Sequence, residues 1–373
     1  MKKKLLIALA VLVVLSIGTL IAGYFFLHFD KRVANIPDGS LSETAQKKEI
    51  PKLSTIAKNL EVPWSLAFLP DGSLMFTERP GRVRLINKDG NLRADPVVTI
   101  ADVQAINEGG LLGIALHPKY SENNQIYFYY TFDAEKSLNR VVRFRYDGTT
   151  LVDQVIVVDE IPGAAIHNGG RIKFGPDGLL YIACGDAANP SHAQDKNSLA
   201  GKILRVTDEG KPAPDNPFGS EVYSWGHRNP QGLAWDDLGR LWATEHGQIA
   251  TDELNLIVPG KNYGWPTIVG DQTQDGMENP VVHSGDANWA PSGAAFYKGS
   301  VFFTGLRGQA LYEAVIDGDK VTIKEHLKGE VGRIRDVVVG PDEFLYISTS
   351  NRDGRNVPTA DDDRILRVNP QKL

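Results

Sequence analysis

Nine residues between positions 108 and 335 have the chemistry of a ligand pocket. They are one histidine, two carboxylates, an asparagine, a glycine and four arginines: His167, Glu108, Asp186, Asn229, Gly247, Arg228, Arg307, Arg333 and Arg335. Scattered surface arginines usually form only weak ion pairs. If these arginines meet at one place, their mutual repulsion requires an anion among them.

The histidine has two interpretations. His167 stands in the segment AAIHNGGRIKFGPDGLLYIACGD, residues 164–186, beside an asparagine and two glycines. A single histidine before a strand is often structural, because imidazole can fix a tight turn with two hydrogen bonds. Next to a carboxylate and a bound anion, a neutral histidine is also suited to act as a general base. The residues alone leave both interpretations open.

An internal repeat could bring these distant residues together. An apolar strand, a turn with Asp, Asn or Gly, and a second strand recur six times, at 67–79, 114–131, 172–186, 233–247, 294–308 and 337–351. A repeat of about 50 residues made of short antiparallel strands is typical of a β-propeller. Residues 53–373 give about 54 residues for each of six blades, which matches the observed spacing of 44 to 61. Five or seven blades do not fit.

The predicted fold class is therefore all-β, a six-bladed β-propeller, with several separate sandwiches as the alternative. Each candidate residue lies just before the first strand of a repeat or just after the second, so all are expected at one end of the channel. Residues 364–370 resemble the outgoing strands at 201–206 and 81–86. A strand at each end of the domain could pair in one blade, which would close the ring and remove exposed edges.

The N-terminal segment has the length of a membrane span. Residues 5–29 contain no Asp, Glu, Lys or Arg, and at about 1.5 Å per residue they would cross a hydrocarbon core of roughly 30 Å. Three lysines precede the segment, which predicts a cytoplasmic N-terminus and an exported remainder. No Ala-x-Ala site follows, which favours an uncleaved N-terminal transmembrane helix over a cleaved signal peptide.

Three regions are therefore predicted along the chain. Residues 1–29 form the membrane anchor or signal segment, residues 30–52 form a polar linker, and residues 53–373 form the catalytic propeller. The predicted location is extracytoplasmic, with the protein anchored to the cell membrane, or secreted if the segment is cleaved.

Composition excludes several other classes. Acidic residues outnumber basic ones by 46 to 40 and the basic residues form no stripe, which argues against nucleic acid as a partner. The single cysteine, Cys184, cannot form an intramolecular disulfide and is predicted to be a buried strand residue. The sequence has no Gly-x-Ser-x-Gly, HExxH or Walker motif, so the serine hydrolase, zincin and P-loop signatures are missing.

Two segments also have structural interpretations. HRNPQG, residues 227–232, could be a proline turn with Arg228 on the surface. DELNLIVPGKNYGWP, residues 252–266, is interpreted as structural, with Asp252 and Glu253 fixing the loop and Trp265 filling space.

Several segments together resemble the soluble quinoprotein glucose dehydrogenases, and in particular their aldose sugar dehydrogenase branch. They are GLLGIALHP, HNGGRIKFGPDG, GHRNPQGLAW, DELNLIVPGKNYGWP and GRIRDVVVGPD, and the similarity extends over residues 53–370. The resemblance implies a six-bladed propeller that holds pyrroloquinoline quinone (PQQ) over the channel with calcium. It also implies oxidation of aldoses at the anomeric carbon to lactones. PQQ, with three carboxylates, would be the required anion.

The resemblance further implies a role for each catalytic residue. His167 would remove the proton of the sugar C1 hydroxyl as hydride passes to the quinone, and Asp186 would orient and charge-balance His167. Arg228 would polarise a quinone oxygen, and Asn229 would hydrogen-bond the quinone.

The same resemblance implies the binding residues. The backbone carbonyls of Gly247 and Gln248 would bind calcium, a cation that prefers oxygen ligands. Arg333 and Arg335 would bind cofactor carboxylates with their forked donors. Glu108 and Arg307 would complete the cofactor site. Glu108, Arg307 and Gln248 differ from the glucose dehydrogenase pattern, which has Gln, Lys and Pro there, so the preferred aldose is left open.

Two other functions are compatible with the sequence. One is a calcium-dependent lactonase or related hydrolase on the same fold, which would need two or three acidic side chains in the channel. The other is a non-catalytic binding propeller displayed from the membrane. For the dehydrogenase, the expected partners are an aldose, an electron acceptor that the sequence does not identify, and the membrane.

Overall fold

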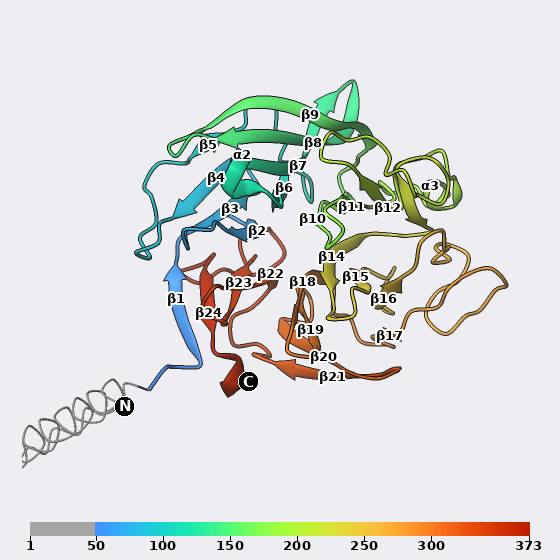
Figure 1. Ribbon diagram of the computed structural model, residues 1–373. Coiled ribbons are helices and arrows are strands. Elements are labelled where there is room, and N and C mark those ends of the chain that lie inside the picture. The colour runs from blue at the N-terminus through green and yellow to red at the C-terminus, as the bar shows by residue number, and fades with distance from the viewer. Residues whose placement is uncertain (1–48) are drawn as a thin grey trace, which may run out of the picture. The chain divides into compact units, whose positions relative to one another are not determined.

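The computed structural model describes residues 49–373, of which residues 51–373 form one compact unit, a ring of six antiparallel sheets (Figure 1). The predicted all-β, six-bladed propeller is confirmed. The predicted membrane segment 5–29 and most of the predicted linker 30–52 lie outside the described residues. From residue 49 onward, no helix is long and apolar enough to cross a bilayer.

Each blade is a four-stranded sheet whose strands follow one another from the channel outward. The first blade contains β2 (Pro63–Phe68), β3 (Leu74–Glu78), β4 (Arg82–Ile86) and β5 (Val98–Thr99). The second contains β6 (Leu111–Leu116), β7 (Gln125–Ala134), β8 (Lys136–Tyr146) and β9 (Leu151–Pro162). The third contains β10 (Ile172–Phe174), β11 (Leu180–Cys184), β12 (Lys202–Val206) and β13 (Val222–Trp225).

The remaining blades follow the same plan. The fourth contains β14 (Pro230–Trp235), β15 (Leu241–Glu245), β16 (Glu253–Ile257) and β17 (Val282–His283). The fifth contains β18 (Pro291–Tyr297), β19 (Ser300–Gly305), β20 (Ala310–Asp317) and β21 (Lys320–His326). The sixth contains β22 (Ile334–Val339), β23 (Leu345–Thr349), β24 (Ile365–Val368) and β1 (Leu53–Ala57). Within residues 49–373, three single turns of helix lie between or after strands: α2 (Tyr120–Asn123), α3 (Ser191–Gln194) and η1 (Pro370–Lys372).

The sixth blade closes the ring with both ends of the domain. Strand β1 pairs antiparallel with β24, with Leu53 opposite Val368. The outermost strand of this blade therefore comes from the start of the domain and the other three from its end, as the repeat of the outgoing strand predicts. Closure of this kind ties the first blade to the last.

The six repeats predicted from the sequence are the inner hairpins of the six blades. In five of these hairpins the register shifts near the start of the inner strand, for example between Pro63 and Ser65 and between Pro291 and Ala294. Such bulges bend a strand and change the direction of side chains. They lie at the end of the channel where the loops preceding the inner strands enter.

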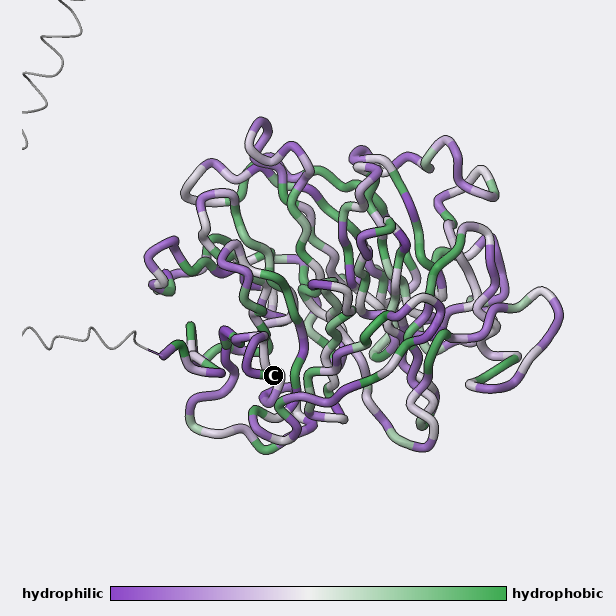
Figure 2. Tube along the Cα trace, turned by 60° about the horizontal axis from the view of Figure 1, so that its bottom comes forward, coloured by the Kyte–Doolittle hydropathy of each residue, from purple (hydrophilic) through white to green (hydrophobic). Residues whose placement is uncertain are grey.

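The hydrophobic core is divided into six clusters, one between each pair of neighbouring blades. Strand β11 is buried over its whole length, including Cys184 as predicted, because blades pack on both of its faces. The outermost strand β21 instead shows mainly exposed residues. In Figure 2 the hydrophobic segments run through the blades, and the loops at both ends are mainly hydrophilic.

Candidate active site

The loops at one end of the channel surround a cavity of about 300 Å³. Eight predicted site residues line this cavity: Glu108, His167, Arg228, Asn229, Gly247, Gln248, Arg307 and Arg333. Arg335 lines a smaller cavity that shares Glu108, His246, Leu306 and Arg355 with the first. The structure thus brings together residues from five of the six blades at the end of the channel that the repeat pattern predicts.

His167 and Asp186 form a close pair at the wall of the cavity. The His167 Nδ1 atom lies 2.8 Å from Asp186 Oδ1, and the carboxylate is fully buried. An ionised carboxylate only accepts hydrogen bonds, so the pair places the proton on Nδ1. His167 lines the cavity, and its Nε2, which has no hydrogen-bond partner in residues 49–373, keeps a free lone pair.

The backbone at His167 is strained and held from two sides. His167 has a φ of 61°, in the left-handed region that non-glycine residues rarely adopt. Its backbone N–H donates to Glu108 Oε2 at 2.9 Å. A Cβ atom on Gly185 would lie 2.0 Å from the His167 carbonyl oxygen, so only glycine fits there. Strain of this kind concentrates at functional sites, where the surrounding structure enforces it.

Asp186 is itself positioned by the segment that sequence reasoning interpreted as structural. Trp265 Nε1 donates to Asp186 Oδ2 at 2.9 Å, and the Ala188 backbone N–H donates to Oδ1 at 2.9 Å. Trp265 therefore does more than fill space, since it holds the carboxylate that holds His167. The Arg228 guanidinium lies 5.3 Å from the centre of the Trp265 indole ring, so the same side chain also contacts the arginine predicted to be catalytic.

Arg228 and Asn229 have spare hydrogen-bonding capacity toward the cavity. Arg228 Nη1 donates to the His246 carbonyl oxygen at 3.3 Å, whereas its buried Nε has no partner within the described residues. Burial lowers the pKa of Arg228 from its ordinary value. Asn229 accepts the Gly169 N–H at 3.0 Å through Oδ1. The alternative of Arg228 on the open surface is wrong, because Arg228 lines the cavity and its Nε is buried.

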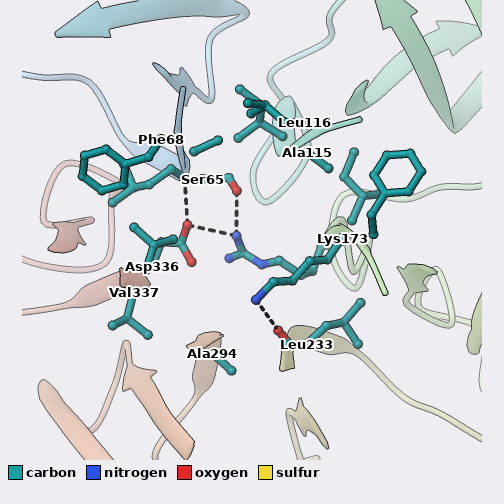
Figure 3. Close-up of a pocket in the computed structure, with 16 residues that line it drawn as sticks. Ser65, Phe68, Ala115, Leu116, Lys173, Leu233, Ala294, Asp336 and Val337 are labelled. Carbon is teal, nitrogen blue, oxygen red and sulfur yellow. Dashed lines mark hydrogen bonds and ion pairs between the residues drawn. The ribbon is translucent and has the colours of Figure 1, made fainter. Parts of the chain in front are cut away.

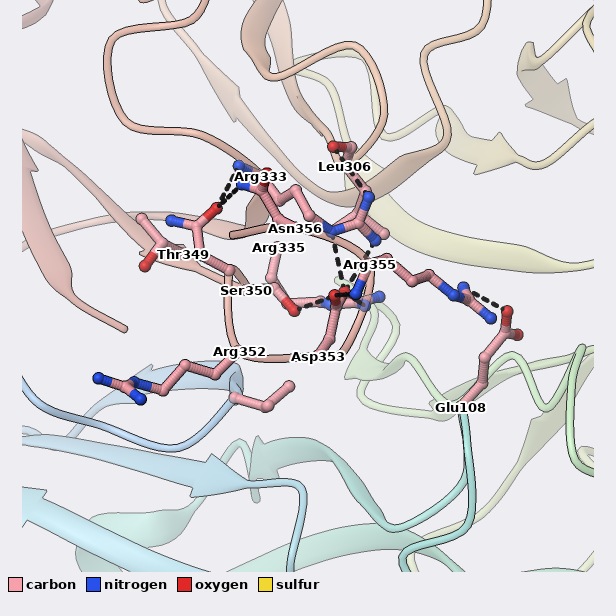
Figure 4. A network of polar contacts seen from close by, with 12 residues as sticks. Glu108, Leu306, Arg333, Arg335, Thr349, Ser350, Arg352, Asp353, Arg355 and Asn356 are labelled. Carbon is pink, nitrogen blue, oxygen red and sulfur yellow. Dashed lines mark hydrogen bonds and ion pairs between the residues drawn. The ribbon is translucent and has the colours of Figure 1, made fainter. Parts of the chain in front are cut away.

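Arg333 and Arg335 share a carboxylate that sequence reasoning missed. Arg333 Nε and Nη2 donate to Asp353 Oδ2 at 2.9 and 2.8 Å, and Arg335 Nη2 lies 3.9 Å from the same oxygen (Figure 4). Burial lowers the pKa of Arg335 to about 9, so it still carries a charge at neutral pH. Burial would raise the pKa of Asp353, but the two arginines outweigh it and the net shift is downward. The negative charge of Asp353 thus offsets part of the repulsion predicted between Arg333 and Arg335.

Glu108 connects His167 to a further arginine. Arg355 Nη1 donates to Glu108 Oε1 at 2.8 Å (Figure 4). Glu108 Oε2 accepts the His167 N–H. Burial would raise the pKa of Glu108, but the His167 hydrogen bond and the charge of Arg355 hold it below its usual range. Arg307 is exposed at the cavity and makes no hydrogen bond or ion pair within residues 49–373.

The loop after β15 presents Gly247 and Gln248 to the cavity. Asp252 fixes this loop, because Oδ1 accepts the Gly247 N–H at 2.9 Å and Oδ2 accepts the Trp289 and Ala290 N–H groups at 2.7 and 2.9 Å. The predicted loop-fixing role of Asp252 is confirmed, but Asp252 also lines the cavity.

His246, immediately before Gly247, is a residue that sequence reasoning missed. It lines both cavities, and its buried Nε2 has no partner in the described part of the chain. His246 directly follows β15, the second strand of an inner hairpin, and this is the same signal that singled out Gly247. The signal also applies to Asp353 and Arg355, which follow β23.

The two cavities together are positively charged. Five arginines line them, against the two acids Glu108 and Asp252. Asp353 contributes one further negative charge behind Arg333 and Arg335. The remaining positive charge and the unpaired buried nitrogens suit an anionic ligand.

The fold and the site define a class of protein: six-bladed propellers with an anion-binding cavity and a histidine–carboxylate pair at one end of the channel. Within this class, the chain belongs to the glucose/sorbosone dehydrogenase family, whose profile matches residues 60–365. The predicted family and the predicted enzyme class, a sugar dehydrogenase, are confirmed.

Three relatives show the extent of the similarity. The PQQ-bound aldose sugar dehydrogenase of Streptomyces coelicolor is 44% identical, with a TM-score of 0.80 over 84% of this chain and 96% of that one. Aldose sugar dehydrogenase YliI of Escherichia coli is 33% identical over 86% of this chain and 93% of its own length. Quinoprotein glucose dehydrogenase B of Acinetobacter calcoaceticus is 32% identical over 74% and 63%, respectively.

Proposed function

We propose that this protein oxidises an aldose at its anomeric carbon to a lactone, with PQQ in the arginine-lined cavity and calcium beside it. The observation that carries the proposal is the His167–Asp186 pair at 2.8 Å, in which His167 lines that cavity and keeps its second ring nitrogen free. The family and the PQQ-bound relative from Streptomyces coelicolor support the choice of substrate and cofactor.

The cavity wall fits PQQ in charge and in hydrogen bonding. Arg228 Nε, Arg335 Nε and His246 Nε2 are buried and have no partner in residues 49–373. Buried donors are normally paired, because an unsatisfied one destabilises the protein by about 1–3 kcal/mol. A planar anion with three carboxylates would satisfy these groups. Arg307, Arg333 and Arg335 would bind its carboxylates, and Asn229 would hydrogen-bond its quinone edge.

The calcium site would consist of backbone oxygens. Gly247 and Gln248 line the cavity, and residues 49–373 contain no cluster of three or more His, Cys, Asp or Glu side chains placed to hold a metal. Hard cations accept carbonyl oxygens readily. Asp252 would act indirectly, by holding the Gly247 loop through the three N–H groups that it accepts.

When bound, PQQ would accept a hydride from the sugar, and calcium would polarise it. The protein's own contribution is a proton transfer and a fixed electrostatic environment. His167 Nε2 takes the proton of the C1 hydroxyl as hydride leaves C1, and Asp186 stabilises the resulting imidazolium. Arg228, already oriented by Trp265 and the His246 carbonyl, places positive charge where negative charge develops on the acceptor.

The hydrolase alternative requires acidic side chains as direct calcium ligands. Both acids that line the cavity are engaged elsewhere: Asp252 with three backbone N–H groups, and Glu108 with His167 and Arg355. Their engagement favours the dehydrogenase. The binding-propeller alternative predicts cofactor-independent function and no turnover, which an assay separates.

The test is reconstitution of the purified protein with PQQ and CaCl₂, followed by absorbance spectroscopy and dye-coupled assays over a panel of aldoses. Dye reduction with at least one aldose is expected. Replacing His167 by Ala should lower turnover by roughly 10²-fold or more while PQQ still binds. The control is His283→Ala, which removes another histidine paired with an aspartate, Asp271, at 3.0 Å. A His167→Ala enzyme with normal turnover would refute the role of this residue.

We also propose that the propeller acts outside the cytoplasm, held to the membrane by residues 5–29. The support is the uncharged run of 25 residues behind three lysines. Fractionation of cells that express the whole chain tests this. Recovery with the membrane and cleavage by added protease in spheroplasts are expected, and recovery in the cytosol would contradict the proposal.

A further inference from the structure

A second cavity of about 260 Å³ lies at the other end of the channel. The first cavity is lined by loops that precede the inner strands, whereas this one is lined by later residues of those strands, including Phe68 of β2, Leu116 of β6 and Val338 of β22. All six blades contribute to its wall, and Figure 3 shows these side chains arranged in a ring. The second cavity is therefore part of the channel axis.

A layer of packed side chains separates the two cavities. Trp64, which is 2% exposed, lies between two arginines: the Arg171 guanidinium is 4.4 Å from its ring centre and that of Arg335 is 5.7 Å away. Gln231 joins the same arginines, because its side-chain Oε1 accepts Arg335 Nη1 and its backbone carbonyl accepts Arg171 Nε, each at 2.9 Å. A ligand in the second cavity would therefore not enter the PQQ site.

Two cations in the second cavity have unused hydrogen-bonding capacity. Arg171 Nη1 donates to Ser65 Oγ at 2.7 Å and lies 3.0 Å from Asp336 Oδ2, but its buried Nη2 has no partner within the described residues. Lys173 Nζ makes one long hydrogen bond, 3.4 Å to the Leu233 carbonyl oxygen (Figure 3). An ammonium group has three donors, so two of them remain available to a ligand.

The charges that face this cavity sum to a positive value. Arg171, Lys173 and Asp336 are its charged lining residues. Asp336 is already neutralised by Arg171, and its Oδ2 also accepts the Leu66 N–H at 2.8 Å. Burial lowers the pKa of Lys173 to about 8, which leaves it mostly charged at neutral pH without a carboxylate of its own. A ligand anion would supply that missing partner.

The rest of the wall selects the body of the ligand. Twelve of the sixteen lining residues are apolar, among them Phe68, Leu116 and Phe174. Apolar surface of this kind disfavours a small, fully hydrated anion such as phosphate and favours a hydrocarbon chain. The volume of the second cavity, about 260 Å³, is several times the roughly 30 Å³ that one water molecule occupies in the liquid.

We propose that this second cavity binds a small carboxylate with a short apolar chain, its carboxylate on Lys173 and its chain against the ring of apolar side chains. The site is distinct from the sugar and PQQ site. Gln231 contacts both Arg171 and Arg335. A carboxylate bound in the second cavity would therefore affect the PQQ side of the channel through Gln231.

Isothermal titration calorimetry with sodium butyrate, on PQQ-free protein and on the reconstituted holoenzyme, tests the proposal. Butyrate should bind, while butyramide and inorganic phosphate should bind at least about tenfold more weakly, since a charge-assisted hydrogen bond to Lys173 and apolar burial are both needed. Lys173→Met, which keeps the hydrocarbon stem and removes the charge, should weaken butyrate by a similar factor. Lys88→Met, at an exposed turn, should leave it unchanged.

Chemical labelling gives a second readout that needs no variant. Acetic anhydride should acetylate Lys173 in the native protein, and butyrate should protect this lysine and leave exposed lysines such as Lys88 reactive, as measured by peptide mass spectrometry. Absence of butyrate binding, equal binding to the wild type and Lys173→Met, tighter binding of phosphate, or no protection of Lys173 would each overturn the proposal.

Discussion

Two histidine–carboxylate pairs in this propeller have the same geometry and different surroundings. His167 Nδ1 lies 2.8 Å from Asp186, and His227 Nδ1 lies 2.8 Å from Glu245. The other ring nitrogen distinguishes them. His227 Nε2 lies 2.8 Å from Ser224 Oγ, and the fully buried ring stacks on Tyr263 with 4.7 Å between ring centres. The corresponding nitrogen of His167 has no partner in residues 49–373, and His167 lines the cavity.

The comparison shows that a carboxylate behind a histidine does not by itself make a base. The pair fixes the tautomer in both places, but only His167 keeps a nitrogen free to take a proton from a ligand. His227, whose two nitrogens are satisfied inside the core, instead links β13 to β15. Four substitutions test whether His167 is catalytic and His227 structural. Their expected effects on activation free energy or on the free energy of unfolding decrease from about 4 kcal/mol to less than 1 kcal/mol.

Asp186→Asn should lower turnover on the order of 10³-fold, about 4 kcal/mol in activation free energy. An amide can donate to Nδ1, which moves the ring proton to Nε2 and removes the base. Dye-coupled rates of the reconstituted enzyme measure this. Glu245→Gln is the matched control, since it makes the same change at the other pair, and its turnover should stay within about tenfold. Equal losses in the two variants would show that the pairs do not differ in role.

His227→Ala should lower the free energy of unfolding by about 3 kcal/mol, because it removes a buried ring, its stacking on Tyr263 and two hydrogen bonds. Urea unfolding followed by tryptophan fluorescence measures the loss. His283→Ala, at an outer strand with an exposed partner, should change stability by less than about 0.5 kcal/mol. A His227→Ala protein as stable as the wild type would mean that this pair is not structural.

Gly185→Ala should lower turnover by roughly 30-fold, about 2 kcal/mol, because the new methyl group would displace the His167 carbonyl and misplace the ring. Gly178, in the turn at the other end of the same blade, has open space around its Cβ position and a φ of 77°. Gly178→Ala should therefore lose about 1 kcal/mol of stability to backbone strain and keep normal turnover. Normal turnover of Gly185→Ala would show that the His167 loop tolerates movement.

Glu108→Gln should have the smallest effect, below about 1 kcal/mol in stability, because it keeps an acceptor for the His167 N–H and loses only a half-exposed ion pair with Arg355. The difference from the wild type should shrink as salt is added to the unfolding buffer. Arg355→Gln removes the other partner and should give a similar value. A hundredfold loss of turnover in Glu108→Gln would place this carboxylate among the groups that touch the substrate.

The fold could be predicted in some detail because its signals are local and repeated. Each inner hairpin, such as 172–186, carries its own apolar pattern and turn, and the spacing counts the blades. The position of a residue relative to its hairpin then fixes the end of the channel at which it lies. This is why Arg228, Arg307, Arg333 and His167 could be grouped without knowledge of any contact.

The partners of these residues could not be predicted, because they depend on how neighbouring blades and loops meet. Asp353 contacts Arg333 from a loop 20 positions further on, and Trp265 reaches Asp186 from another blade. The chemical type of a residue is also a poor guide to its role. An aromatic residue such as Trp265 is readily interpreted as filling space in the core, and nothing in the sequence distinguishes His246 from its neighbours beside Gly247. Trp265 and His246 both lie in segments that the sequence pattern singles out, so the sequence fails to predict only which atoms they contact.

The pairing of β1 with β24 has a consequence for how the protein is made. While the chain is being synthesised, β1 leaves the ribosome about 300 residues before its partner β24. Until then β23 has an open edge, and such edges can pair with other chains. The ring therefore stays incomplete until β24 has been synthesised, and pairing of β1 with β24 is the step that closes it.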